Sequence, residues 1–296
     1  MSNLTKYLMI IFIILIAIFL IVFNNFWEKN ISNKNSIIFS YPGNELEFAW
    51  EKLPNLEENY LIKERFDKEF LNTSYNLYQF FLYIKRLPLY MWFIEENLKK
   101  YNIPDDFKYL PIAESALRND VVSSAWAAWI WQFMPATALE YWLIVNEDID
   151  ERYNFEKSTI AAIKYLNYLY WLFWNRTLVA ASYNRWQNGI KSALNDQKVN
   201  NYYDLYLNEE TSRYVFRILA IKYVIQDYET KKSYIDKLIG WVYKKPEIEI
   251  KKVWKIADLK SWARKNNQSY QTIKNLNMWI KKDFLPEGNW EIKLLK

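Results

Sequence analysis

The sequence predicts a mainly α-helical protein with an N-terminal transmembrane helix and a small α+β module at its C-terminus. Three observations support this fold class. Residues 7–23 form an unbroken apolar run. From about residue 56 to residue 228, apolar side chains recur at the three- and four-residue spacing of amphipathic helices. After Pro246, two short alternating segments enclose two short helical ones, which is the pattern of a βααβ unit.

The N-terminal run, YLMIIFIILIAIFLIVF, contains 17 apolar residues. Its length is at the short end of the range for a membrane-spanning helix. Asn24, Asn25 and Phe26 follow it, so the small-x-small site of a cleaved signal peptide is absent. No face of the run is polar, which disfavours a buried helix of a soluble domain. We therefore expect residues 1–24 to be an uncleaved signal anchor rather than a cleaved signal peptide. Either one places the remaining chain outside the cytoplasm.

The composition excludes several classes of function. The chain has no histidine and no cysteine, which excludes Ser/His and Cys/His triads, disulfides, thiol chemistry and most zinc sites. The net charge of +5 is mild, and the basic residues are not gathered into one stripe. The sequence therefore predicts no nucleic-acid binding, no metal and no cofactor.

Residues 25–100 are expected to hold a tether and a helical N-terminal extension. The stretch 28–45 is polar and rich in Asn and Ser, which is typical of a tether. LEENYLIKERFDKEFL and YNLYQFFLYIKRL then place apolar residues at helical spacing. Pro88 predicts a break before another helix that ends near Tyr101.

The central region, residues 101–228, is expected to be all-α. Ile103–Asp106 (IPDD) predicts the start of a helix that ends around Ser115, with acidic residues in its first turn. Pro111 is tolerable there only within the first turn or so. Pro135 predicts another helix, which it opens at the first position. Further helices are expected at about 156–173, 177–184 and 210–227.

Residues 247–296 are expected to form a separate small domain. EIEIKK and NWEIKLL alternate like strands, and DLKSWARKN and SYQTIKNLN between them predict two short helices.

Glu114 is the strongest candidate for catalysis. Cleavage of a glycosidic bond needs a carboxylic acid that stays protonated near neutral pH, so that it can donate to the leaving oxygen. A glutamate at the end of an apolar helix suits this role, because desolvation raises its pKa. On its own, however, a helical glutamate is more often a solvated surface residue.

The motifs around Glu114 resemble those of the family 1 lytic transglycosylases, in particular the membrane-bound lytic transglycosylase D type. The matching segments are Glu114-Ser115, Ser123 with the following IWQFMP, AASYN at Ala180–Asn184, FAxEKLP at Phe48–Pro54, IPDDFKYLPIAES at Ile103–Ser115 and TSRYV at Thr211–Val215. The resemblance covers about residues 45–225 and implies a goose-lysozyme-like, all-α catalytic domain, an SLT-type domain over residues 101–228. The C-terminal residues 247–296 are similar to a degenerate LysM-like module that lacks the usual Gly-Asp-Thr opening.

The resemblance also implies roles for individual residues. Glu114 would be the only catalytic acid and base, cleaving between N-acetylmuramic acid and N-acetylglucosamine to leave a 1,6-anhydromuramoyl end. Ser123 and Gln132 would hydrogen-bond the sugar at the cleavage site, and Met134 would line it. Tyr183 and Asn184 would close the cleft from the opposite side.

The implied partner is the peptidoglycan glycan strand. The implied location is the cell envelope, with the chain anchored in the cytoplasmic membrane by its N-terminal helix and the catalytic domain on the outer side. Two alternatives stay open: a muramidase that hydrolyses the same bond on the same fold, and a non-catalytic wall-binding protein.

Tryptophan stands where this family has glycine. The chain has 15 tryptophans but only 4 glycines, whereas average usage of about 7% predicts roughly 20 glycines. SSAWAAWIWQ and SYNRW carry tryptophan at family glycine positions, and the candidates are Trp50, Trp126, Trp129, Trp142, Trp174 and Trp186. Some bacterial lineages read UGA as glycine, and translation of UGA as tryptophan produces this substitution. Trp131 fits the family as a true tryptophan, with core packing favoured over sugar stacking.

Overall fold

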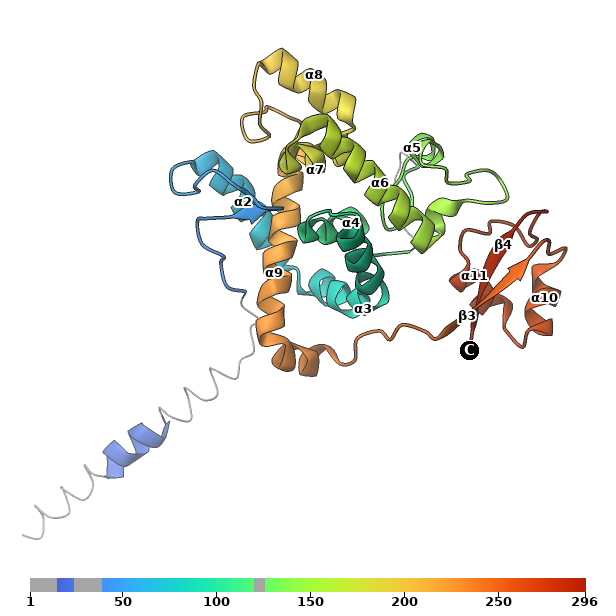
Figure 1. The fold of residues 1–296 in the computed structure, drawn as a ribbon. Helices are drawn as coiled ribbons and strands as arrows, with labels where there is room; N and C mark the ends of the chain where they lie inside the picture. The colour runs from blue at the N-terminus through green and yellow to red at the C-terminus, as the bar shows by residue number, and fades with distance from the viewer. Residues whose placement is uncertain (1–14, 24–38, 120–125) are drawn as a thin grey trace, which may run out of the picture. The chain divides into compact units, whose positions relative to one another are not determined.

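The computed structural model describes residues 15–23, 39–119 and 126–296 (Figure 1). The chain divides into two units, Met1–Ile38 and Phe39–Lys296. In the first unit, residues 15–23 are helical. Within the three described ranges, no helix combines the length and the apolar character needed to cross a membrane. Residues 7–14, the first part of the expected anchor, lie outside these ranges.

The second unit is mainly helical, which confirms the mainly α character predicted for this part of the chain. Its elements in chain order are β1 (Glu47–Phe48), β2 (Glu51–Lys52), α2 (Tyr60–Tyr75), α3 (Leu77–Lys100), the 3-10 helix η1 (Asp105–Tyr109), α4 (Leu110–Ser115), α5 (Pro135–Glu140), the 3-10 helix η2 (Glu151–Tyr153), α6 (Phe155–Phe173), α7 (Arg176–Arg185), α8 (Gln187–Gln197), α9 (Glu209–Ile239), β3 (Ile248–Val253), α10 (Leu259–Lys265), α11 (Tyr270–Leu276) and β4 (Trp290–Leu295).

The N-terminal part of this unit is packed from its first residue. Phe39 is buried, and its ring lies 4.7 Å from that of Phe80. Phe39, which falls in the expected tether over 28–45, is therefore part of the packed unit. The expected break at Pro88 is also wrong, because α3 continues through this proline. Ile84 and Ile94 are buried on either side of Pro88, and their packing holds both halves of the helix on the core despite the lost hydrogen bond.

Helix α9 is the central helix of the second unit. It packs against α2, α4 and α7, and in Figure 1 these helices surround it. The side chain of Asn208 caps its first turn, accepting from the Thr211 amide. The helix extends to Ile239, beyond the expected end at 227, because Gly240, with φ of 72°, is the first residue that favours termination. Lys222 on α9 donates to Asp106 and to the Glu47 carbonyl, which joins η1 and β1 to the helix.

The C-terminal residues have the predicted strand–helix–helix–strand order. β3 and β4 pair antiparallel, with Ile250 opposite Lys293. Their shared core is apolar and includes Leu259, Ile273 and Ile280. It also includes Ile149, which belongs to the central region of the chain.

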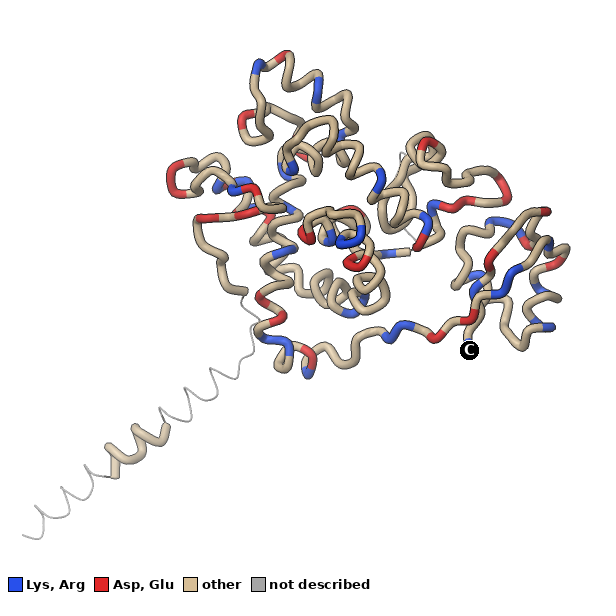
Figure 2. The backbone as a smooth tube through the Cα atoms, viewed as in Figure 1, with Lys and Arg blue, Asp and Glu red and all other residues tan. Residues whose placement is uncertain are grey.

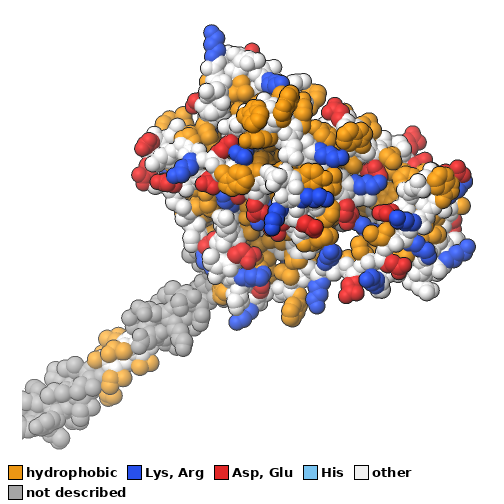
Figure 3. All heavy atoms as spheres, in the orientation of Figure 1, with side chains coloured by type: hydrophobic (Ala, Val, Ile, Leu, Met, Phe, Trp, Pro, Cys, Tyr) orange, Lys and Arg blue, Asp and Glu red, His pale blue; other side chains and the backbone are white. Residues whose placement is uncertain are grey.

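The surface is mixed in character. Lys and Arg residues are interspersed with Asp and Glu along the described part of residues 39–296 (Figure 2), and hydrophobic side chains are scattered among them on the face in view (Figure 3). Part of this exposed apolar surface is tryptophan: Trp50, Trp126, Trp142, Trp174 and Trp186 are 49% to 77% exposed.

These five tryptophans and Trp129 share an unusual backbone conformation. All six have φ between 49° and 70°, a region that residues with a Cβ rarely adopt and glycine adopts freely. Trp27 lies outside the described residues, and none of the other eight tryptophans has positive φ. The six positions selected from the sequence are therefore the six described tryptophans with a glycine-like backbone.

Three of these positions also lie in local structures that glycine commonly occupies. Trp50 is the second residue of the two-residue turn between β1 and β2, where Ala49 also has positive φ, as in a type I′ turn. Trp174 is the left-handed C-cap of α6. Trp186 joins α7 to α8 with φ of 68° and ψ of 141°, close to a region that is essentially restricted to glycine.

Candidate active site

Glu114 lies one residue before the end of the short helix α4. Pro111 is in the first turn of α4, where a proline costs no hydrogen bond. The expected single helix from Ile103 is divided, because η1 is a 3-10 turn and the α-helical part begins at Leu110. Ala116, with φ of 57°, ends α4. The Ser115 hydroxyl lies within hydrogen-bond distance of the carbonyls of Pro111 and Ile130, which ties α4 to the segment that follows the loop.

The Glu114 carboxyl is partly buried and faces α9. Its Oε1 accepts a short hydrogen bond from the Tyr214 hydroxyl. Burial raises the pKa of Glu114 from its usual value to about 7, and Glu210 adds to the rise, whereas the Tyr214 hydrogen bond and Arg217 oppose it. The carboxyl is therefore protonated in a large fraction of molecules at neutral pH and can lose this proton without a large energy cost. These are the properties of a general acid and base.

Two buried tyrosines complete this environment. Burial and the charge of Glu114 raise the pKa of both Tyr183 and Tyr214 well above the usual value. Both phenols therefore stay protonated and act as hydrogen-bond donors. Tyr183 donates to the Trp131 carbonyl at 2.9 Å, which connects α7 to the segment Trp126–Met134.

The segment Trp126–Met134 forms a tight turn beside α4. Ala128 and Phe133 form an isolated antiparallel bridge, and the Gln132 amide closes the turn on the Trp129 carbonyl at 3.2 Å. The Gln132 side chain also donates to that carbonyl, at 2.6 Å. Met134 is exposed where the segment enters α5.

Asn184 lies at the opposite side, on α7. Its side chain donates to Glu210 at 3.2 Å and accepts from Thr211 at 2.9 Å, so both ends of the amide are bound to the first turn of α9. Tyr214 follows one turn later on the same helix. Elements α4, α7, α9 and the segment Trp126–Met134 thus meet around Glu114.

Several residues predicted from the sequence therefore lie in one region, and one cannot be placed. Tyr183 and Asn184 reach this region through their hydrogen bonds, and Gln132 lies in the turn tied to Ser115. Ser123 lies outside the described residues. Sequence reasoning assigned no role to Tyr214, although TSRYV was one of the matching motifs. The signal was present, but only the fold shows that its tyrosine hydroxyl reaches Glu114.

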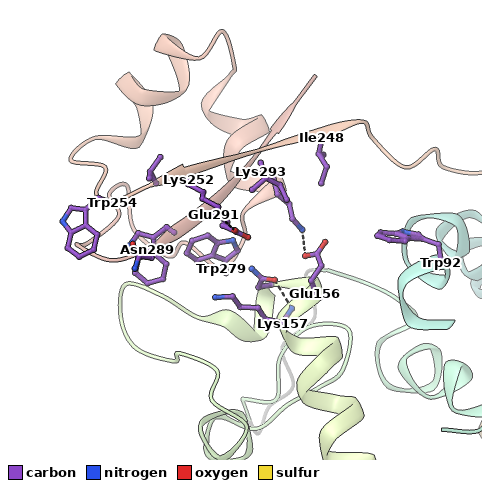
Figure 4. Close-up of a pocket in the computed structure, with 14 residues that line it drawn as sticks. Trp92, Glu156, Lys157, Ile248, Lys252, Trp254, Trp279, Asn289, Glu291 and Lys293 are labelled. Atoms are coloured by element: carbon purple, nitrogen blue, oxygen red, sulfur yellow. Dashed lines mark hydrogen bonds and ion pairs between the residues drawn. The ribbon is translucent and has the colours of Figure 1, made fainter. Parts of the chain in front are cut away.

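A large cavity lies elsewhere in the second unit. It has a volume of about 770 Å³, and its lining includes Trp92, Trp254 and Trp279 together with the ion pair between Glu156 and Lys293 (Figure 4). Glu114 is not among its lining residues. The cavity adjoins β3 and β4 rather than the end of α4.

Comparison with known proteins shows what this region is similar to. Residues 91–205 match the family described as Transglycosylase SLT domain. Membrane-bound lytic murein transglycosylase D of Escherichia coli (strain K12) is 31% identical over 197 residues, which cover 64% of this chain and 41% of that protein. The chain thus spans about two fifths of the length of this curated relative.

Two solved structures overlap with the chain at low TM-scores. Lytic transglycosylase Slt from Pseudomonas aeruginosa, as an inactive mutant, has a TM-score of 0.38 and 18% identity, over 50% of this chain and 25% of that one. The 70-kDa soluble lytic transglycosylase in complex with bulgecin A has a TM-score of 0.33 and 20% identity, over 53% of this chain and 25% of that one. The likeness of this chain to SLT transglycosylases rests on the family match over residues 91–205 and on the 31% identity, and not on these overlaps.

Proposed function

We propose that this protein is a peptidoglycan lytic transglycosylase with Glu114 as its only acid and base. The observation that carries the proposal is the Glu114 carboxyl at the end of α4, with its pKa raised to about 7 and a hydrogen bond from Tyr214. The SLT domain match over residues 91–205 and the names of the relatives support the substrate class.

The proposed reaction needs one carboxyl group. Protonated Glu114 donates its proton to the oxygen between N-acetylmuramic acid and N-acetylglucosamine, and the bond from C1 to this oxygen breaks. The Glu114 carboxylate then takes the proton from the C6 hydroxyl of the muramoyl residue, and O6 bonds to C1. The product is a 1,6-anhydro ring, no water is consumed, and Glu114 is protonated again. The N-acetyl group of the substrate supports the positive charge at C1, so no second carboxylate is required.

We assign the surrounding residues to substrate binding. Gln132 and Met134 would contact the sugar at the cleavage site together with Ser123, and Tyr183 with Asn184 would form the opposite side. In the absence of substrate, Gln132 already donates to the Trp129 carbonyl. We infer that sugar hydroxyls compete for this amide when a glycan strand binds.

The test compares Glu114→Gln with Glu209→Gln on isolated peptidoglycan. Glu209 is an exposed glutamate on α9 paired with Arg213, so it controls for the loss of one carboxylate. We expect Glu114→Gln to lower the rate by about 1000-fold, because it removes a positioned general acid, and Glu209→Gln to retain it. Mass spectrometry of the released muropeptides identifies the chemistry. Anhydro ends, lighter by one water, support the proposal, whereas hydrolysed reducing ends would make the enzyme a muramidase. Equal activity of both variants would contradict the role of Glu114.

We also propose that the chain is anchored in the cytoplasmic membrane and acts in the cell envelope. The support is the apolar run at 7–23 and the name of the 31%-identical relative. In this proposal residues 25–100 are the tether and helical extension, 101–228 the transglycosylase domain and 247–296 a LysM-like module. Fractionation of cells that express the full chain or a chain without residues 1–24 tests the anchor. Recovery of the full chain in the soluble fraction would contradict it.

We further propose that the natural protein carries glycine at positions 50, 126, 129, 142, 174 and 186, encoded by UGA. The support is that all six have positive φ and that five of them expose the indole ring to solvent. Trp129 is buried, and among the described residues its indole N–H has no acceptor. A left-handed conformation costs a residue with a Cβ about 1–2 kcal/mol, so tryptophan is disfavoured at each position by its backbone alone.

The gene and the intact mass of the natural protein test this proposal. We expect UGA at the six codons and UGG at Trp131, and a mass lower than the printed sequence by six replacements of tryptophan with glycine. UGG at positions 126, 129 and 186 contradicts the proposal. In that case three indoles crowd the region of Glu114, and a non-catalytic wall-binding protein becomes the better assignment.

A further inference from the structure

The C-terminal strand–helix–helix–strand residues are joined to the central region through one short loop. Ile149 forms an isolated antiparallel bridge with Ile280 and is buried in the C-terminal core. On either side of it, the Asp150 amide donates to the Trp279 carbonyl and the Lys281 amide donates to the Asp148 carbonyl, each at 2.8 Å. The loop is thus paired through an isolated bridge with the segment Trp279–Lys281 of residues 248–295, which we call the C-terminal module.

A second link lies beside this loop. Lys293 on β4 pairs with Glu156 in the first turn of α6, as the dashed line in Figure 4 shows. Lys281 also lies over the ring of Tyr153, at 4.5 Å from its centroid. The module is therefore attached by main-chain pairing, one ion pair and one cation–π contact.

The same loop holds a buried arginine that reaches the candidate site. The carboxylate of Asp150 accepts from Arg152 at two atoms, Nε at 2.9 Å and Nη2 at 2.7 Å. The remaining nitrogen, Nη1, donates to the Trp126 carbonyl at 2.6 Å and to the Phe133 carbonyl at 3.0 Å. Both side chains are less than 10% exposed.

This arrangement gives Arg152 a fixed position. A guanidinium bound at two nitrogens by a carboxylate cannot rotate without breaking charge-assisted hydrogen bonds. Its third nitrogen then holds both ends of the turn between Trp126 and Phe133. That turn carries Gln132, and the residue after it is Met134.

From these contacts we propose that the C-terminal module is a positioning element for the active site. Its docking on Asp148–Asp150 fixes the main chain that carries Asp150. Asp150 fixes Arg152, and Arg152 fixes the turn Trp126–Phe133, which is tied to α4 by the hydrogen bond between Ser115 and the Ile130 carbonyl. Arg152 is a positioning residue, because its contacts are to the protein and not to the glycan. The effect that we expect on the reaction rate rests on the proposed function. The effect that we expect on the order of the turn does not.

The kinetic test is a double-mutant cycle with Ile149→Ser, which removes the docking contact, and Arg152→Met, which keeps the aliphatic stem. Each single variant is expected to lower kcat about tenfold and to leave KM within about twofold, since the sugar still binds but is misplaced relative to Glu114. Because both act through the same turn, the double variant is expected to be no slower than Arg152→Met. Arg152→Lys should recover part of the rate, and Lys265→Ala, on an exposed module surface, should match the unmodified chain.

The outcomes separate clearly. The proposal is overturned if the losses in kcat of the two single variants multiply in the double variant. It is also overturned if the single variants change KM alone. If Arg152→Met fails to fold, the same cycle with Arg152→Lys shows whether the losses in kcat multiply or are shared.

A second measurement keeps the inference separate from the proposed function. The Ala128 amide donates to the Phe133 carbonyl at 3.1 Å inside the turn, so its hydrogen exchange reports the order of the turn whether or not the protein cleaves glycan. We expect faster exchange at Ala128 in Ile149→Ser and Arg152→Met, with α9 unchanged. An unchanged Ala128 rate in Ile149→Ser overturns the positioning role, whereas faster exchange in a protein without lytic activity refutes the proposed function alone.

Discussion

The two sides of the candidate site differ in how well their side chains suit their backbone. On the side of α4 and α9, Glu114 accepts from Tyr214, and Ser115 meets two carbonyls. On the side of the segment Trp126–Met134, two tryptophans occupy left-handed positions. Trp131 and Trp129 show the contrast within this segment. Trp131 is buried with an ordinary φ and donates to Thr159 at 2.9 Å. Trp129 is also buried, but it has φ of 65° and its indole N–H has no acceptor in the part of the chain that the structure describes.

The difference indicates which part of the printed sequence agrees with the fold. A sequence that specifies its structure is consistent in local conformation, packing and hydrogen bonding. On the Glu114 side, Glu114 and Tyr214 meet all three conditions, although Ala116 and Leu117, which follow α4, also have positive φ. The Trp126 and Trp129 positions fail the first, and Trp129 also fails the third. Such conflicts usually mark functional strain, but here they recur at positions 50, 142, 174 and 186, outside the segment. Glycine as the natural residue at these six positions therefore explains the conflicts better than functional strain does.

The largest effect is expected when all six tryptophans are replaced by glycine in one chain. We expect the glycine chain to digest peptidoglycan about 100-fold faster than the printed chain, because misplacement by about 1 Å in an active site costs a factor of this size. We also expect a gain of several kcal/mol in the free energy of unfolding, at about 1 kcal/mol for each relieved position. Release of muropeptides and urea unfolding measure the two quantities.

The control replaces with glycine four exposed tryptophans that have ordinary φ: Trp92, Trp171, Trp241 and Trp254. This chain also loses exposed indole rings but relieves no left-handed residue. If it becomes as stable and as active as the glycine chain, the comparison between the two sides of the site is wrong.

Much of the fold could be predicted, because it depends on local patterns. Pro135 opens α5, and the βααβ order follows from alternation and helical spacing. The exceptions depend on tertiary contacts. The helix through Pro88 is held by packing on either side of it, and α8, which the sequence did not predict, starts at Gln187, directly after Trp186 as its N-cap.

The site could be predicted only in part, for a similar reason. Glu114 is identified by its motif. The motif TSRYV contains Tyr214, but the sequence alone assigns no role to this tyrosine. A contact between residues 100 positions apart leaves no periodic signal in one sequence. Asp150 and Arg152 are close together in the sequence, but the role of the pair depends on the Trp126 and Phe133 carbonyls, which accept hydrogen bonds from Arg152.

A smaller effect is expected on the Glu114 side, where stability should depend on pH. The folded-state pKa of Glu114 is raised to about 7, so the neutral carboxyl contributes stability that is fully present below the unfolded-state pKa and is lost as pH rises through about 7. Relative to Glu114→Gln, which stays neutral, the unmodified chain should lose at most roughly 3 kcal/mol between about pH 5 and about pH 8.

Urea unfolding of both chains at several pH values measures this loss, with Glu209→Gln as the control. The Glu114→Gln chain should become the more stable one at the alkaline end. Parallel curves for the two chains would show that burial does not hold Glu114 in its neutral form, and the site would then lose its acid.

The smallest expected effect isolates one backbone position on the other side of the comparison. Trp186→Gly and Trp186→Ala both remove an exposed indole, but only glycine relieves the φ of 68°. We expect the glycine variant to be more stable than the alanine variant by about 1 kcal/mol, because alanine keeps the Cβ that this conformation disfavours. Trp92 lies inside α3, and there the order should reverse by about the same amount, since alanine is the better helix former. If alanine is the more stable replacement at both positions, the left-handed backbone at Trp186 does not exist in solution and the argument for glycine fails at that site.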